Sequence, residues 1–430
     1  MLRMTLPRAA RPDGRAARVA SGRTRYPGPM LTYDEALDCI RSLPDGGTTE
    51  RISLTEGDGR VLAEDACLDR DVPGFDRATM DGYAVALDGD RTSFEVIGTI
   101  FAGEDKDLSP RPGQAVRIMT GAPCPPEVTV IPIERTDGGQ DVVTVTEPDA
   151  LVPARHIAWR GEDGHEGDPV ATAGQRLNPV MLASVAMAGL TDVLVWRRPR
   201  VGVVTTGDEV GGSGRAGIRD SNGPLLVTLL RAFGCDVVRS HAKDDDDLLE
   251  GALAEAGEGR DMVVTVGGVS AGAKDLVPGA ATRLGYETVF HKVAMQPGKP
   301  VLVCRHPGGR FFVGLPGNPV SVLATAHLIL GPVLGRLIGG WEPGWIDVPL
   351  ARDFEHEGRR RLFLPARLAD GGVDPVRWNG SGDLIAAAAG DGLIDAAPGT
   401  VKSAGERVRF LPYVGVRASD HGSMPPRKRT

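Results

Sequence analysis

The chain has 430 residues, 41% of them hydrophobic and 25% charged, a composition typical of globular proteins with two to four domains. It contains no run of roughly 18 apolar residues of the kind that crosses a membrane. A net charge of −8, with only 5% aromatic residues, also argues against a protein that binds nucleic acid.

The cysteines and the two chain ends indicate the cellular setting. Five widely spaced cysteines include no CxxC pair, so they predict neither a disulfide framework nor a zinc site and favour the cytoplasm: Cys39, Cys67, Cys124, Cys235 and Cys304. Residues 1–29 hold seven arginines and one aspartate, without an apolar segment. We expect a disordered basic tail or a misassigned start codon there, not a secretion signal, and a second tail over residues 414–430.

The first predicted elements are a helix and a small β domain. Thr32 and Glu35 form a capping box that opens an amphipathic helix ending near Leu43. Short β-rich runs between Gly, Pro and Asp turns then predict a β domain; they are residues 93–100, 114–119, 128–134 and 142–147. A second helix begins at Asn178-Pro179 and ends near Gly189.

From about residue 200 to 340, predicted strands and helices alternate. The strands are 201–206, 236–240, 261–266, 301–304 and 311–315, of which the last two can form a hairpin. The helices are 224–233, 247–256, 274–284 and a long apolar helix, capped by Asn318, that ends near Ile338. This alternation predicts a mostly parallel α/β domain. Short β-like runs over residues 345–413 predict a separate small β domain.

Glycine-rich polar sequences follow several of these strands. They are Thr206-Gly207-Asp208-Glu209, Gly267-Gly268-Val269-Ser270 and Pro316-Gly317-Asn318-Pro319. Since ligands bind at the carboxyl ends of parallel strands, we expect an anion site there, with glycines that let the backbone approach phosphate oxygens. Asp208, Glu209, Asp220 and Asp275 supply oxygen ligands that suit Mg²⁺, and Lys299 supplies positive charge. A single loop of this kind is more often a plain turn, but several of them in one domain favour a ligand site.

Two other interpretations concern single motifs. Gly268–Gly272 matches the GxSxG nucleophile elbow, so a serine hydrolase with Ser270 and a later histidine (His291, His306 or His327) is a rival function. Against it, no oxyanion loop precedes the motif, and Asp275 suits phosphate or metal better than acyl transfer. The run Asp244–Asp247 is either part of the ligand site or only a solvated helix N-terminus.

Taken together, the motifs resemble the molybdopterin molybdenumtransferase family of the MoeA type, which is related to the carboxy-terminal domain of gephyrin. The matching stretches occur in the family's order at residues 75–85, 117–123, 160–163, 206–209, 220–222, 267–275, 297–300 and 315–321. Met80-Asp81-Gly82-Tyr83-Ala84, Arg117–Pro123 and Leu315–Ser321 are specific in combination, although no single stretch would be.

The resemblance implies an α/β multidomain protein with β-rich accessory domains. The expected parts are a helical–β domain (30–60 and 161–198), an inserted β domain (61–160), the α/β molybdopterin-binding domain (199–340) and a C-terminal β domain (341–413). It also implies a homodimer, with the site between the α/β domain of one subunit and the C-terminal domain of the other. The implied reaction inserts molybdate into adenylated molybdopterin and releases AMP, with Mg²⁺ as cofactor.

The resemblance also assigns site residues by motif. The catalytic residues it implies are Asp81, Thr120, Asp163, Glu209, Asp275 and Lys299. The substrate-binding residues are Asp208, Asp220, Asp244, Asp245, Gly267, Gly268, Ser270, Pro316, Pro319, Ser321 and Ser381. Asp275, Asp244 and Asp245 are the implied metal ligands. Contacts with a molybdopterin adenylyltransferase and with acceptor molybdoenzymes are further implied partners, and neither nucleic acid nor a membrane is expected.

The chain departs from the family pattern at two cationic positions. Gln296 stands where the family has a lysine, and Pro365 stands where it has an arginine, although Arg359, Arg360, Arg361 and Arg367 lie close by in sequence. Loss of two cations that would contact an oxyanion favours a second hypothesis. In it, the chain is a molybdopterin-binding or scaffold paralogue with weak insertion activity.

Overall fold

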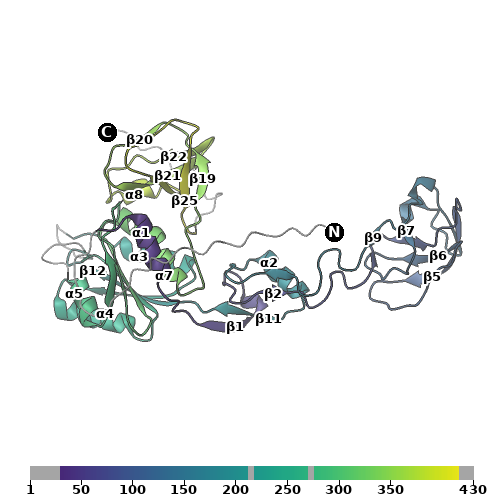
Figure 1. Ribbon diagram of the computed structural model, residues 1–430, viewed down its shortest axis with the longest axis horizontal. Coiled ribbons are helices and arrows are strands. Elements are labelled where there is room, and N and C mark those ends of the chain that lie inside the picture. Colours follow the sequence, from purple (N-terminus) through teal and green to yellow (C-terminus); the bar gives the residue numbers. More distant parts are fainter. Residues whose placement is uncertain (1–29, 212–216, 270–275, 416–430) are drawn as a thin grey trace, which may run out of the picture.

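The computed structural model describes residues 30–211, 217–269 and 276–415. The molecule is elongated (Figure 1): an α/β body and a C-terminal β body lie at one end, a small middle body follows, and a β body lies at the far end. None of the helices in these ranges is long and apolar enough to cross a membrane.

Helix α1 (Tyr33–Arg41) begins as its capping residues predict. The Thr32 hydroxyl accepts the Glu35 N–H, and the Glu35 carboxylate accepts the Thr32 N–H at 2.8 Å. Its buried side chains, Tyr33, Ala36, Leu37 and Ile40, pack against the α/β body and not in the middle of the molecule.

The middle body consists of two small antiparallel sheets and one helix. Its elements are β1 (Thr49–Ser53), β2 (Ala66–Cys67), β10 (Pro169–Ala171), α2 (Pro179–Met187), β11 (Asp192–Trp196) and the 3₁₀ turn η1 (Leu54–Glu56). Strand β1 pairs with β11, and β2 pairs with β10. Val61 and Leu62 also form bridges to Arg176 and Val195. Residues 61–67 therefore pack in this body, so the inserted β body begins after them and later than expected at position 61.

The far β body, which we call the distal module, runs from β3 (Arg77–Ala78) to β9 (Ile157–Ala158), and these two strands pair at its base. Its five-stranded sheet has the order β7-β4-β6-β5-β8. The strands are β4 (Gly82–Val85), β5 (Ser93–Ile100), β6 (Gln114–Ile118), β7 (Thr129–Pro132) and β8 (Val142–Thr144), with 3₁₀ turns η2 (Ile133–Arg135) and η3 (Pro148–Ala150). The four predicted runs correspond to β5, β6, β7 and β8.

The α/β body is built on a six-stranded sheet of order β13-β12-β14-β18-β17-β15. The first four strands are parallel and the last two run antiparallel to their neighbours. The strands are β12 (Arg200–Thr206), β13 (Asp236–Ala242), β14 (Met262–Val266), β15 (Glu287–His291), β17 (Leu302–Arg305) and β18 (Phe311–Leu315). The mostly parallel sheet and the β17–β18 hairpin confirm the sequence prediction.

Helices cover both faces of this sheet. Side chains of α1, of α3 (Asn222–Ala232) and of the helical segment after residue 318 share one core with Val201 and Val203. Side chains of α4 (Asp246–Gly257) and α5 (Val277–Arg283) share the opposite core with Val204. The alternation within β12 explains its continuous apolar sequence, since a central parallel strand is buried on both faces.

The predicted long helix from Asn318 to Ile338 is interrupted. It consists of α6 (Pro319–Thr325), a π-helical turn η4 (Ala326–Leu330) and α7 (Gly331–Gly335). Pro332 has no N–H to continue the α-helical ladder, which accounts for the wider turn before it. Asn318 occupies the N-cap position but makes no side-chain cap bond; its amide instead donates to the Ser381 hydroxyl at 2.8 Å.

The C-terminal body is a β structure joined to the α/β body. Its main sheet has the order β16-β21-β23-β25-β19, with β22 against β21, and β20 pairs with β24. The elements are β16 (Met295–Gln296), β19 (Ile346–Pro349), β20 (Phe354–His356), β21 (Arg361–Ala369), β22 (Gly372–Pro375), α8 (Leu384–Ala387), β23 (Gly392–Ala396), β24 (Thr400–Lys402) and β25 (Arg407–Pro412). Because β16 comes from the α/β region of the sequence, its pairing with β21 links the two bodies.

Candidate active site

A pocket of about 200 Å³ lies where the carboxyl ends of neighbouring strands meet. Strands β12, β14 and β18 are parallel, so the turns after Thr206, Val266 and Leu315 come together at one edge of the sheet. The predicted site residues that line this pocket are Glu209, Asp220, Asp244, Gly267 and Gly268, together with Gly317 of the loop after β18. The expected position of the ligand site, at the strand ends, thus contains a pocket.

Gly267 is required by the backbone at the floor of the pocket. Its φ is +95°, a backbone conformation that residues with a side chain rarely adopt. A Cβ on it would lie 2.7 Å from the Thr206 hydroxyl oxygen, which itself donates to the Val266 carbonyl at 3.1 Å. The Gly267 N–H is bonded to the Leu315 carbonyl at 3.0 Å, so the loop is fixed to both neighbouring strands.

The carboxylates around the pocket have different partners. Asp220 accepts the Gly223 N–H at 2.8 Å and forms an ion pair with Arg239 at 2.9 Å, so its charge is already compensated. No ion pair involves Glu209 or Asp244 within the described part of the chain. Asp208 accepts the Asp244 N–H at 3.2 Å, which connects the loops after β12 and β13.

The Asp244–Asp247 run serves two purposes. Asp245 is the N-cap of α4 and accepts the N–H groups of Asp247 and Leu248 at 3.1 and 3.0 Å. Asp244, one residue earlier, lines the pocket. The helix-cap interpretation therefore holds for Asp245, and the ligand-site interpretation of Asp244 stays a prediction.

The loop after β18 meets the C-terminal body of the same chain. The Val320 N–H donates to the Ser381 carbonyl at 2.9 Å. Pro316 and Ser321 are buried and Pro319 is the first residue of α6, so Ser381 bonds to the short segment that carries these three predicted site residues. The direct pairing of β16 with β21 explains why the chain's own C-terminal domain contacts this loop. The contribution of the other subunit's C-terminal domain to the site stays a prediction.

Lys299 lies in a loop that is packed onto α6. Its side chain is exposed, and its carbonyl accepts the Val293 N–H at 3.0 Å. A Cβ on the neighbouring Gly298, whose φ is +101°, would lie 2.4 Å from the Thr325 side chain, which shows how closely the loop approaches the helix. The loop that carries Lys299 is therefore held against the helix that begins at Pro319.

Sequence reasoning did not assign Asn222 and Arg239 to the site. Asn222 lines the pocket, and its amide donates to the Gly317 carbonyl at 2.7 Å, joining the start of α3 to the loop after β18. Its position in the Asp220-Ser221-Asn222 motif could have indicated from the sequence that Asn222 lies at the site. Arg239 is on the edge strand β13, where nothing in the local sequence indicates that it pairs with Asp220.

A second group of predicted residues gathers at the base of the distal module. The Asp81 carboxylate accepts both the Thr120 hydroxyl and the Thr120 N–H at 2.7 Å. These bonds, the hydroxyl first, hold the pKa of the exposed Asp81 carboxyl below its usual range. The Arg160 N–H donates to Asp76 at 2.8 Å, and Asp163 is exposed three residues later. Three stretches that are distant in sequence thus meet in one place, which we call the distal cluster.

The distal cluster and the strand-end pocket lie far apart within one chain. In Figure 1 strand β9, at the base of the distal module, is separated from the α/β body by the whole middle body. Large apolar side chains are exposed around the cluster: Phe75 (47%), Met80 (37%), Phe101 (50%) and Trp159 (46%). Exposed apolar residues gathered in one region are typical of a protein interface.

Two predicted residues, Ser270 and Asp275, lie outside the described residues. Within the described part of the chain, no group of three His, Cys, Asp or Glu side chains could hold a metal ion. Of the histidines considered for a hydrolase, His327 is fully buried, and both ring nitrogens contact backbone groups, the Leu323 carbonyl at 2.8 Å and the Val414 N–H at 2.9 Å. His327 is therefore not available as a general base.

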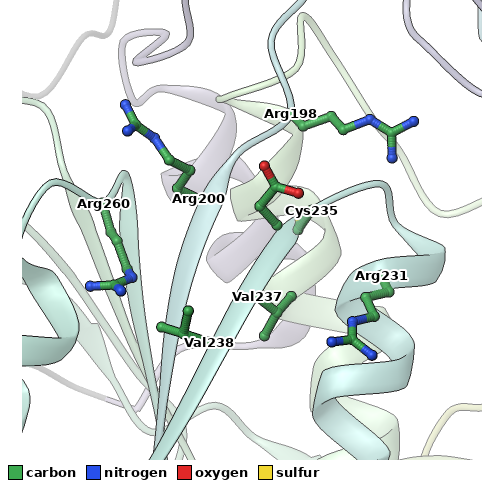
Figure 2. A pocket seen from close by; sticks show the side chains of 8 residues that line it. Arg198, Arg200, Arg231, Cys235, Val237, Val238 and Arg260 are labelled. Carbon is green, nitrogen blue, oxygen red and sulfur yellow. The ribbon is translucent and has the colours of Figure 1, made fainter. Parts of the chain in front are cut away.

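A larger pocket of about 480 Å³ lies at the opposite edge of the sheet, where β12 and β13 begin. Figure 2 shows that its arginines, Arg198, Arg200, Arg231 and Arg260, point in different directions and not toward a common centre. Arg260 donates to the Glu255 and Glu258 carbonyls at the end of α4, and Arg231 is in the last turn of α3. These positions complement the negative ends of the helices and do not indicate an anion site.

Comparison with known proteins identifies similar chains over most of the length. Residues 31–189 match the MoeA N-terminal region (domain I and II), residues 202–336 a probable molybdopterin binding domain, and residues 347–413 the MoeA C-terminal region (domain IV). The molybdopterin molybdenumtransferase of Synechococcus elongatus is 35% identical over 80% of this chain and 91% of its own length. That of Haemophilus influenzae is 35% identical over 72% of this chain and 78% of its own.

A solved structure has the same arrangement. The crystal structure of a molybdopterin biosynthesis MoeA protein from Pyrococcus horikosii matches with a TM-score of 0.74 and 30% identity. The match covers 90% of this chain and 100% of that one, so it includes the bodies at both ends of the molecule.

Proposed function

Since the chain belongs to the MoeA family, the molybdopterin molybdenumtransferases of molybdenum cofactor biosynthesis, we propose that it inserts molybdate into adenylated molybdopterin and releases AMP. The observation that carries this proposal is the pocket at the strand ends, where glycine backbone and oxygen-bearing side chains converge. Such a pocket suits an anionic, phosphate-bearing ligand.

In the proposed mechanism the protein positions two anions against each other. The glycine loops after β12 and β14 let the backbone approach the phosphates, and Asp220 and Asn222 hold the loops that form the wall. Lys299, in the loop that packs against Thr325 at the end of α6, supplies positive charge for the oxyanion, and Pro316, Pro319, Ser321 and Ser381 shape the site at the start of that helix. In the overall reaction the two dithiolene sulfurs replace two molybdate oxygens, which leave as water, and one water breaks the phosphoanhydride bond between the molybdopterin phosphate and AMP, so that AMP leaves.

The pocket's donors fit Mg²⁺ held jointly by the protein and the substrate. Glu209 and Asp244 line the pocket without an ion-pair partner among the described residues, and Mg²⁺ characteristically takes one or two carboxylates, with phosphate oxygens and water completing its shell. We propose Asp244 and Asp275 as ligands, and Asp245 as a ligand only through its second oxygen, because its first oxygen caps α4. Bound Mg²⁺ would neutralise charge on the phosphates.

We propose further that the working form is a homodimer in which the distal cluster of one subunit completes the pocket of the other. The two groups of residues are far apart in one chain (Figure 1), yet the family motifs assign Asp81, Thr120 and Asp163 to the same site as Glu209. The exposed apolar side chains around the distal cluster support a contact there with a second copy.

The remaining parts of the proposal concern setting and partners. All five cysteines are free thiols, which supports a reducing cytoplasmic location. A molybdopterin adenylyltransferase would supply the substrate, and molybdoenzymes would receive the product. The second candidate function is a molybdopterin-binding paralogue with weak insertion activity, which Gln296 and Pro365 favour because they lack the family's cations.

One experiment distinguishes the two functions. Purified protein is incubated with adenylated molybdopterin, Mg²⁺ and molybdate, and AMP release and active cofactor are measured. The proposed enzyme releases AMP only when molybdate is present. Tight binding of the adenylated substrate without molybdate-dependent AMP release would favour the binding paralogue instead.

A further inference from the structure

Strand β16 places Gln296 beside β21, the strand that also carries Pro365. Gln296 is the second residue of β16 and pairs with Leu362 of β21, which continues to Pro365. Arg359 and Arg360 immediately precede β21, and Arg361 is its first residue. These arginines therefore lie beside Gln296 in space, although they are more than 60 residues away in sequence. Arginines therefore lie close to position 296, where the family's lysine is replaced by glutamine.

Two of the nearby arginines are committed to other contacts. Arg361 bonds to both oxygens of Asp395 at 2.7 and 2.6 Å and to Asp34 at 2.8 Å. It also lies over the rings of Tyr33 and Phe363. Arg367 is further along β21 and pairs with Asp374 at 3.4 Å. These two arginines join α1 and β22 to β21, and their charges are already compensated.

Arg360 differs from both. Its guanidinium donates one hydrogen bond, at 3.2 Å, to the carbonyl of Met295, the residue before Gln296. It is half-buried, and within the described part of the chain no carboxylate pairs with it. A partly buried guanidinium without a counter-ion is costly, and an anionic ligand would relieve that cost. Arg359, the next residue, is exposed and has no such contact in the described chain.

We propose that Arg360 binds the tetrahedral oxyanion substrate in place of the lysine that Gln296 replaces. This inference rests on the proposed function. The loop from Gln296 to Lys299 is packed on α6, so a cation anchored at Met295 lies at the start of the loop that carries Lys299. The planar guanidinium has further N–H groups that can bind two oxygens of an oxyanion at once.

The test compares Arg360→Gln with Arg359→Gln, a matched loss of one charge at the neighbouring exposed position. Molybdate binding is measured by calorimetry at fixed salt in the presence of adenylated molybdopterin. Loss of a charge-assisted hydrogen bond should weaken molybdate binding by roughly tenfold or more in Arg360→Gln. Arg359→Gln should stay within about twofold of the wild type. Equal affinities in the two variants would overturn the inference.

A second comparison guards against a general loss of structure. In the Arg360→Gln background, Gln296→Lys should restore most of the molybdate affinity, because it returns a cation to the neighbouring position. Failure to restore it, with unchanged affinity for adenylated molybdopterin and an unchanged melting temperature, would contradict the assignment. Because the readout is binding, a wild type that binds molybdate but releases no AMP would count against the proposed function and not against Arg360.

Discussion

The strand-end pocket and the distal cluster contain similar residues but are built differently. The pocket is formed by turns that follow parallel strands of one sheet, so its position follows from the fold of a single body. The distal cluster is formed by three loops at the base of the distal module, where the Asp81 and Asp76 carboxylates accept the N–H groups of Thr120 and Arg160. The pocket is thus assembled within one chain, whereas the proposal that the cluster acts in a second copy's site has to be tested separately.

Among substitutions that leave every charged site residue in place, the largest expected effect is that of a single methyl group in the pocket. Gly267→Ala places a Cβ 2.7 Å from the Thr206 hydroxyl at a φ of +95°. The loop must shift, and misplacement of bound reactants by about 1 Å can lower the rate on the order of a hundredfold. The measurement is kcat/KM for molybdate-dependent AMP release.

A matched control separates this effect from backbone strain. Gly259 also has a positive φ, +63°, but a Cβ there would have no atom within 4 Å. Gly259→Ala should cost about 1 kcal/mol of stability and leave the rate unchanged. Equal activities for the two variants would show that the Gly267 loop is not part of the site.

The buried His327 should make the stability of the protein depend on pH. Complete burial lowers the pKa of His327 from 6.5 to about 4. Its ring nitrogens bond to the Leu323 carbonyl in α6 and to the Val414 N–H after β25. Folding favours the neutral imidazole of His327. The stabilisation that this residue contributes is therefore fully present above pH 6.5 and is lost as the pH falls toward 4. The loss is at most about 3 kcal/mol.

The measurement is denaturant unfolding of the wild type and of His327→Gln between pH 7.5 and pH 4.5. Glutamine can keep a donor and an acceptor at this position but does not titrate. The variant should lose less stability than the wild type over this range, with the distal module unaffected. Parallel pH dependences of the two proteins would contradict the assignment of the shift to His327.

The smallest effect is expected in the distal cluster. Thr120→Val removes the hydroxyl that donates to Asp81 but keeps the backbone N–H bond. The pKa of Asp81 should rise toward its usual value, so that the acid limb of the pH–rate profile moves to higher pH and kcat/KM falls by roughly threefold to tenfold. Thr120→Ser should behave like the wild type. A profile unchanged in Thr120→Val would show that Asp81 does not act in the rate-limiting step.

Much of the fold was predictable because local signals agreed with tertiary structure. The capping box at Thr32, the Asn178-Pro179 helix start and the buried β-branched strands β12 and β14 all formed as expected. The pocket position followed as well, since strand polarity alone brings the turns after Thr206 and Val266 together.

Other features depended on contacts that local sequence does not encode. One such contact is the packing of Trp341 on Gly331, where a Cβ would meet the Trp341 ring at 2.5 Å. Asp245 caps α4 whereas Asp244 lines the pocket, and this difference depends on the exact residue at which α4 begins. The contact of Ser381 with Asn318 of its own chain depends on the β16–β21 pairing, which joins segments 66 residues apart.

The most direct test of the two-copy site uses mixed dimers of two inactive variants. Asp81→Asn and Glu209→Gln subunits carry different tags, and the heterodimer is isolated by sequential affinity purification. If the distal cluster of one subunit serves the pocket of the other, one site in each heterodimer has both native residues. Molybdate-dependent AMP release should then return to about half of the wild-type rate per dimer, while both homodimers stay inactive. An inactive heterodimer of confirmed composition would show that the two clusters do not complement each other between subunits.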